Sequence, residues 1–249
     1  MRTANPALNP ETFSRVGYSY DRSDAMTIQG TVNKTGLLLI LALITAFWVW
    51  NMFFSSSGNP AVITPWTMIG AIGGLITALV TAFKRAWAPV TAPIYALLEG
   101  LFLGGISAIF EAQFSGIVIQ AVGLTFGTLF CLLMVYKSGL IKATENFKLG
   151  IASATGAIFL VYLVSMILGF FGVQMPFIHE SGIIGIGFSI FVVVIAALNL
   201  VLDFDFIENG SQMGAPKYME WYAAFGLMVT LVWLYIEILR LLTKLRSRD

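Results

Sequence analysis

The chain has 249 residues, of which 58% are hydrophobic and only 11% are charged, with a mean hydropathy of +0.86 and a formal net charge of +1. About a quarter of the residues in an ordinary soluble domain are charged, so this composition excludes a soluble or disordered chain. A single cysteine, Cys131, excludes an internal disulfide scaffold, and a single histidine, His179, excludes a histidine-built metal site. The near-zero net charge argues against nucleic acid as a partner. A polytopic membrane protein remains.

The first 33 residues are polar and include Arg2, Arg15 and Arg22, so we expect no cleavable signal peptide. The apolar run that begins near Thr35 is long enough to cross about 30 Å of hydrocarbon, and we expect it to target the chain to the membrane. We therefore divide the chain into a cytoplasmic N-terminal segment (1–33), a transmembrane domain (34–245) and a short tail (246–249).

Runs of about 18 to 25 mostly apolar residues predict transmembrane helices, because a helix that rises about 1.5 Å per residue needs that length to cross. The chain has seven such runs, at about 35–54, 63–83, 89–111, 117–136, 151–173, 182–203 and within 216–245. They are continuously apolar, whereas the strands of a membrane barrel would alternate. The predicted fold class is all-α, a polytopic membrane bundle of seven transmembrane helices.

The basic residues predict the orientation, because cytoplasmic loops collect Lys and Arg. Alternate connections, beginning with the N-terminal segment, hold ten of them, and the three intervening loops hold none. The N-terminus is therefore predicted to face the cytoplasm, which makes the lipid bilayer the first expected partner. Seven crossings would leave four basic residues on the outer side. Either the preference of basic residues for the cytoplasmic side does not hold at the last helix, or that helix is re-entrant. We expect seven crossings.

Small residues recur at the spacing that lets helix backbones approach closely. They are Gly70, Gly73, Gly74, Gly100, Gly104, Ser107, Gly123, Gly127, Gly185 and Ser189. Helix packing is the expected role, and a glycine-lined pore is the alternative.

Acidic residues inside the apolar runs are functional candidates, because a charge within hydrocarbon costs at least about 2.5–3.5 kcal/mol. Glu99 lies near the middle of the third run, Asp203 near the cytoplasmic end of the sixth, and Glu237 within the seventh. Each has a structural alternative. Glu237 would pair with Arg240 at i,i+3, and Glu99 would be a neutral acid bonded to another helix. Asp205, next to Asp203, is interpreted as a solvated charge at the loop edge.

Two carboxyls that meet in low dielectric share a proton and form a pH-dependent latch. When ionised, the same oxygens suit Ca²⁺, although so few ligands predict transit rather than tight binding. No catalytic constellation accompanies them, since His179 stands alone and the glycine run at 182–187 lacks the residues of a phosphate loop. We expect no enzyme, no catalytic residue and no cofactor.

Four stretches of this sequence resemble the Bax inhibitor 1-like family of seven-span membrane proteins, in particular its bacterial YccA-like branch. They begin at Met26, Tyr95, Leu200 and Trp221, and read MTIQGTVNKT, YALLEGLFLG, LVLDFDFIE and WYAAFG followed by YIEILRLL from Tyr235. The resemblance covers most of the chain from about Met26 onward.

The resemblance implies that the last helix is central and that acidic residues of the sixth and seventh helices form a pH sensor, carried over here to Asp203 and Glu237. It further implies a pH-sensitive calcium leak, suppression of cell death in eukaryotes and, in bacteria, binding to the FtsH-type membrane protease. Asp203, Glu237, Glu99 and Asp205 are the predicted pH-sensing and ion-pathway residues. Arg240 and Arg85 are candidate counter-charges.

Thirty-four positions separate Asp203 from Glu237, so the two carboxyls are expected to meet only if the last helix projects from the membrane by two or three turns. The leading hypothesis is a bacterial inner-membrane cation leak, most plausibly for Ca²⁺, controlled by this pair. The alternative is a non-conducting regulator that binds an FtsH-type protease through residues 1–33. A proton-coupled solute transporter is a third interpretation without a substrate signature.

Overall fold

The computed structural model describes residues 24–172 and 182–247, and within these ranges it contains seven α-helices, one short 3-10 helix and no strand. A single isolated bridge joins Ala25 to Pro216. All seven α-helices are long and apolar enough to cross a membrane. The prediction of an all-α fold with seven transmembrane helices is therefore confirmed.

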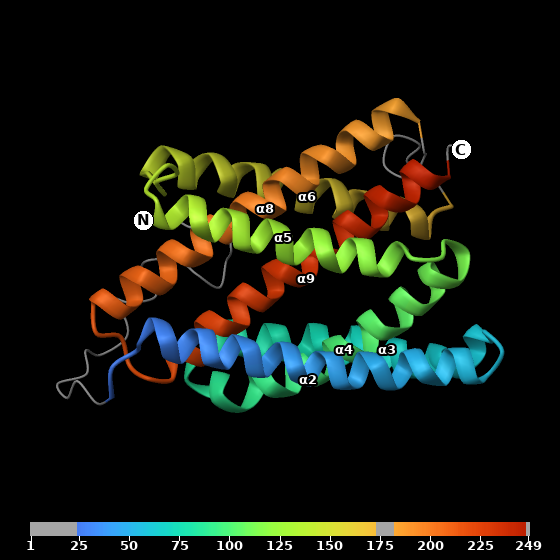
Figure 1. Ribbon diagram of the computed structural model, residues 1–249, viewed down its shortest axis with the longest axis horizontal. Helices are drawn as coiled ribbons and strands as arrows, with labels where there is room; N and C mark the ends of the chain where they lie inside the picture. The colour runs from blue at the N-terminus through green and yellow to red at the C-terminus, as the bar shows by residue number, and fades with distance from the viewer. Residues whose placement is uncertain (1–23, 173–181, 248–249) are drawn as a thin grey trace. The chain divides into compact units, whose positions relative to one another are not determined.

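The helices follow the predicted order (Figure 1). Their bounds are α2 Ile28–Ser55, α3 Pro60–Phe83, α4 Ala88–Gln113, α5 Ile117–Lys137, α6 Glu145–Phe170, α8 Ile183–Gln212 and α9 Met219–Arg246, and the 3-10 helix η3 is Arg85–Trp87.

Capping residues determine where several helices begin. The hydroxyl of Thr27 accepts a hydrogen bond from the Gly30 amide, and Thr144 caps α6 through the Phe147 amide. Asn59 caps α3, with Pro60 in the first position, where a missing amide hydrogen costs nothing. Because Thr27 and Thr144 precede the apolar runs, α2 and α6 begin six or seven residues earlier than hydropathy alone predicts. The predicted end of the fifth helix, at residue 173, lies outside the described residues.

Helices α8 and α9 also differ from expectation at their ends. α8 continues through Gln212, so Asp205 lies inside the helix, and its interpretation as a loop-edge charge is wrong. The Asp205 carboxylate forms an ion pair with Lys148 of α6, and this contact holds the part of α8 that extends beyond the predicted end. α9 is a single helix of 28 residues, which is long enough for a full crossing.

The chain divides into two compact units. The described residues of unit 1 are 117–172, 182–205 and 229–247, and those of unit 2 are 24–116 and 206–228. Unit 1 therefore contains α5, α6, the first part of α8 and the last part of α9, whereas unit 2 contains α2, α3, α4 and the remaining parts of α8 and α9. Each unit is described separately below.

In unit 2, α4 packs against both α2 and α3 through small residues, as predicted. A Cβ at Gly100 or Gly104 would overlap the α2 backbone at Ala42 or Ala46, and a Cβ at Gly70 would overlap the α4 backbone. Close contact of helix backbones is therefore possible only because these positions are glycine.

In unit 1, α6 packs against α8 through Ile151, Ile158, Val192, Ile195 and Leu202. The packing predicted for Gly123 and Gly127 of α5 is not found here. A Cβ at either position would meet no atom within 4 Å in the described part of the chain, so the prediction is wrong for this helix.

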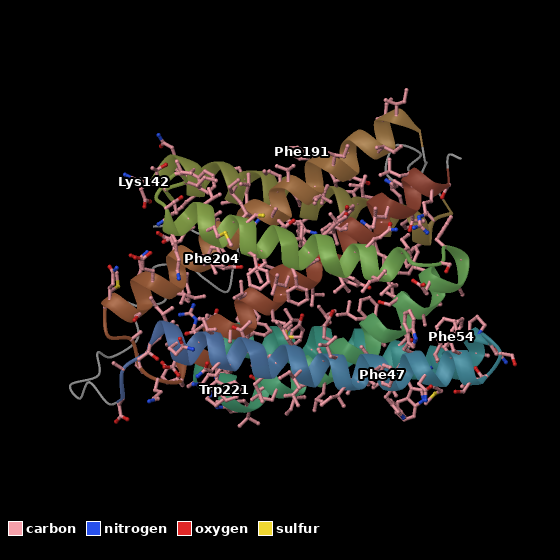
Figure 2. All side chains as sticks on the ribbon, in the orientation of Figure 1. Phe47, Phe54, Lys142, Phe191, Phe204 and Trp221 are labelled. Carbon is pink, nitrogen blue, oxygen red and sulfur yellow. The ribbon has the colours of Figure 1, made fainter. Side chains whose placement is uncertain are left out.

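Large apolar side chains cover the outside of the helices. Phe47, Phe83 and Phe170 are 71%, 82% and 83% exposed, and Figure 2 labels Phe47 together with the exposed Phe54 and Phe191. Such a surface is stable in lipid rather than in water, because hydrocarbon chains solvate it without the cost of exposing it to water. The structure therefore agrees with lipid contact along these helices.

Candidate functional site

Asp203 on α8 is the most isolated buried charge of unit 1. Its side chain is 1% exposed, and neither carboxylate oxygen has a partner in hydrogen-bonding geometry within residues 24–172 and 182–247. The Thr230 hydroxyl of α9 is the polar group beside it. A buried carboxyl without satisfied hydrogen bonds is costly, so it is a site where a proton or a cation would be stabilised.

Glu237 on α9 lies in a closed network with α6. Its carboxylate is 2% exposed, and its Oε2 and Oε1 atoms lie 3.0 and 3.1 Å from the Tyr162 hydroxyl. Arg240 donates to Glu237 Oε1 at 2.9 Å and to the Tyr162 oxygen at 2.8 Å. The predicted pairing of Glu237 with Arg240 one turn away is therefore present, and Arg240 is its counter-charge.

The structure does not join Asp203 and Glu237 by a hydrogen bond. The α9 residue beside Asp203 is Thr230, and Glu237 lies seven residues further along the helix, about 10 Å by helical rise. The Asp203 carboxyl of α8 and the Glu237 carboxyl of α9 therefore lie at different levels along α9, each with its own neighbours, instead of sharing one proton directly.

Asp205 lies close to Asp203 in sequence but has a different environment. Lys148 of α6, which is 3% exposed, contacts its carboxylate at 2.7 Å and that of Glu145 at 3.7 Å. Since Glu145 is 58% exposed, the ion pair with Asp205 is the one that compensates the buried ammonium.

Lys244, near the end of α9, is also buried. Its ammonium donates to the Gly185 carbonyl oxygen at 3.0 Å and to the Ser189 hydroxyl at 2.9 Å, both on α8. Lys244 is therefore an internal packing group, not one of the free loop charges that the orientation rule counts.

Unit 2 contains the remaining predicted residues. Glu99 of α4 is 9% exposed and lies beside Tyr95 of its own helix, and its carboxylate faces the α3 backbone at Gly74. Arg85 lies over the Tyr222 ring, with 5.7 Å from its guanidinium carbon to the ring centre. Burial raises the pKa of the nearby Tyr218 hydroxyl, and the positive charge of Arg85 opposes that shift.

A second buried carboxylate of unit 2, Glu220, was not predicted. It is 1% exposed, forms an ion pair with Lys34, and accepts hydrogen bonds of 2.9 Å from the amide and the hydroxyl of Thr27. A Cβ at Gly30 would overlap this carboxylate. The start of α9 is thereby attached to the start of α2.

Several polar partners in unit 1 were also missed, namely Lys148, Thr155, Tyr162, Ser189 and Asn199. A heptad count would have found part of this set, because Lys148, Thr155 and Tyr162 are seven residues apart on α6, as are Thr230, Glu237 and Lys244 on α9. Residues at that spacing share one helix face.

Seven apolar helices with an apolar outer surface define an α-helical multi-pass membrane protein. Its interior contains buried carboxylates among apolar side chains. The profile of the Bax inhibitor 1 like family matches residues 5–247. The chain therefore belongs to this family. Among curated proteins and solved structures, none matches the chain.

Proposed function

We propose that this protein is a pH-sensitive leak for cations, most plausibly Ca²⁺, in the bacterial inner membrane, with its N-terminus in the cytoplasm. The observation that carries the proposal is Asp203, whose two buried carboxylate oxygens lack a hydrogen-bond partner among the described residues. Ca²⁺ prefers carboxylate and hydroxyl oxygens, and both are present where Asp203 meets Thr230.

Membership of the Bax inhibitor 1 like family supports the proposal, since the resemblance implies a calcium leak for such proteins. Few oxygens surround Asp203 compared with the six to eight that Ca²⁺ takes in a tight site, which favours transit over storage. Glu237, Glu99 and Asp205 remain the further candidates for the ion pathway, and the central position of the last helix remains part of the proposal. The buried residues of α9, such as Leu234 and Leu239, support that position.

The test is Ca²⁺ flux into liposomes that contain the purified protein and a calcium dye, measured between about pH 6 and about pH 8. We expect wild-type flux to change with pH and Asp203→Asn to abolish that change. Glu145→Gln is the matched control, because this carboxylate is 58% exposed and its contact with Lys148 is 3.7 Å long. Flux that is equal in wild type, Asp203→Asn and empty liposomes would reject the proposal.

The second candidate function is a regulator that binds an FtsH-type membrane protease through the N-terminal segment. One observation favours it: the described end of this segment is attached to the α8–α9 connection. Met26 donates its amide hydrogen to Ala215, Lys217 donates to Asp24, and Glu220 holds Thr27 and Lys34. The described beginning of the chain, from Asp24 to Thr27, is therefore held at a defined place beside the α8–α9 connection.

Deletion of residues 1–23 keeps this attachment and removes only the proposed binding segment. We expect the deleted chain to lose co-purification with the protease while it retains its melting temperature in detergent. Protease binding that equals that of the full chain would remove residues 1–23 from the proposal.

A further inference from the structure

The polar side chains inside unit 1 form a file along three helices. On α8, from its C-terminal side, the successive polar positions are Asp205, Asp203, Asn199 and Ser189. Their partners are Lys148 for Asp205, Thr230 for Asp203, Thr155 for Asn199 and Lys244 for Ser189. The partners on α6 and on α9 follow the same order, because both helices run antiparallel to α8 at these contacts.

The file reaches across most of a bilayer. Asp205 and Ser189 are sixteen residues apart on α8, about 24 Å by helical rise, against a hydrocarbon thickness of about 30 Å. The network of Tyr162, Glu237 and Arg240 lies between the Asn199 and Ser189 levels, since Glu237 is midway between Thr230 and Lys244 on α9 and Tyr162 follows Thr155 by two turns on α6. The network therefore supplies polar groups in the stretch between Asn199 and Ser189, where α8 itself has only apolar residues.

The file is buried although it is polar. Asp203, Asn199, Ser189, Glu237 and Lys244 are each at most 5% exposed. On α6 the polar residues alternate with apolar ones on the same face, in the order Lys148, Ile151, Thr155, Ile158, Tyr162. Interhelical hydrogen bonds between such groups contribute to helix association, but the Asp203 oxygens, which lack a hydrogen-bond partner among the described residues, add a desolvation cost that calls for another role.

The chemistry of these groups also suits protons. Hydroxyl, carboxyl and amide groups donate and accept hydrogen bonds, as a proton relay requires. A cluster of His, Cys, Asp and Glu residues able to hold a metal ion is absent from the described ranges.

We propose that this file is a water-assisted proton route that connects the buried carboxyls of Asp203 and Glu237 with the two faces of the membrane. A proton enters at one end, passes along the hydroxyl and carboxyl groups through short chains of water, and leaves at the other end, with no covalent change in the protein. The inference deepens the proposed function, because a pH sensor that is 1–2% exposed needs a path by which protons reach it.

The groups that face the two carboxyls determine how the route responds to pH. Thr230 lies beside Asp203, and the ion pair of Lys148 with Asp205 lies less than one turn away along α8. Glu237 faces Tyr162 from α6 and Arg240 from its own helix, and Lys244 is two turns further on α9. Protonation of either carboxyl therefore removes a negative charge that lies close to a permanently charged lysine or arginine.

The test is proton flux in Ca²⁺-free proteoliposomes with a pH dye inside, driven by a potassium gradient and valinomycin. We expect wild-type flux above that of empty liposomes, and a loss of at least about ten-fold, or about 1.4 kcal/mol in barrier height, in Thr155→Val and Asn199→Leu. Thr155→Ser keeps the hydroxyl and should keep the flux. Thr125→Val is the control on α5, where the hydroxyl bonds only to the Ala121 carbonyl of its own helix.

Two results would overturn the route: wild-type flux equal to empty liposomes, or equal flux in wild type, Thr155→Val and Asn199→Leu. An equal loss in Thr155→Ser and Thr155→Val would also overturn it, since packing rather than the hydroxyl would then matter. The calcium proposal is tested separately, because a chain that conducts protons without a Ca²⁺ leak would reject that proposal and retain the route.

Discussion

The hydroxyl of Tyr162 on α6 lies 3.0 and 3.1 Å from the two carboxylate oxygens of Glu237 on α9. The same hydroxyl accepts a hydrogen bond from Arg240, so three side chains from two helices satisfy one another inside an apolar unit. A carboxylate in hydrocarbon is tolerated when its oxygens are occupied in this way. Asp203 on α8, which lies beside Thr230 two turns away from Glu237 on α9, lacks that compensation among the described residues.

Replacing Tyr162 by Phe removes the hydroxyl but keeps the ring against Phe188. Interhelical hydrogen bonds in membranes contribute about 0.6 kcal/mol on average and about 1.7 kcal/mol at most, so we expect a loss in this range. The free energy of unfolding in mixed detergent measures it. In a Glu237→Gln background the loss should shrink, and an unchanged loss would show that the two groups are not coupled.

Gly30→Ala should destabilise the protein by about 1–3 kcal/mol, because the new Cβ overlaps the buried Glu220 carboxylate. Gly36→Ala is the matched control on the same helix, since a Cβ there meets no atom within 4 Å. Alanine favours a helix over glycine by up to about 1 kcal/mol, so the control should be neutral or stabilising. Equal melting temperatures of the two variants in detergent would contradict the Glu220 contact.

Gly104→Ala and Gly127→Ala should separate packed glycines from unpacked ones. A Cβ at Gly104 overlaps the α2 backbone at Ala46, and we expect a loss of about 1–3 kcal/mol. Gly127 of α5 has open space around it and should tolerate alanine without loss. Thermal unfolding in detergent compares them, and a larger loss at Gly127 would mean that α5 packs at this position.

The two carboxylates near Lys148 should differ in their contribution to stability. Asp205→Asn leaves a buried ammonium without its charged partner, which typically costs about 3–5 kcal/mol. Glu145→Gln removes an exposed and longer ion pair, and such pairs contribute at most about 1 kcal/mol. Unfolding free energies of the two variants test this order, which the reverse result would refute.

The site was predictable where its contacts are local. Glu237 and Arg240 are three residues apart on one helix, so their pairing follows from helical geometry, and the structure has it. Asp205 was misinterpreted because its partner, Lys148, is 57 positions away in sequence. Tyr162 and Glu220 were missed for the same reason, since each depends on a contact with a distant segment.

The sequence by itself determined the number, order and helical nature of the membrane spans, because crossing length and hydropathy are properties of each segment taken alone. Only the tertiary structure decided that Asp203 meets Thr230 and that Glu237 meets Tyr162. Which faces of two helices meet depends on the rotation and register of both, and a shift of two residues on α9 would turn Thr230 and Glu237 by about 200°, away from these neighbours. The packed apolar face that α6 shares with α8 and with Trp233 of α9 fixes that register in unit 1.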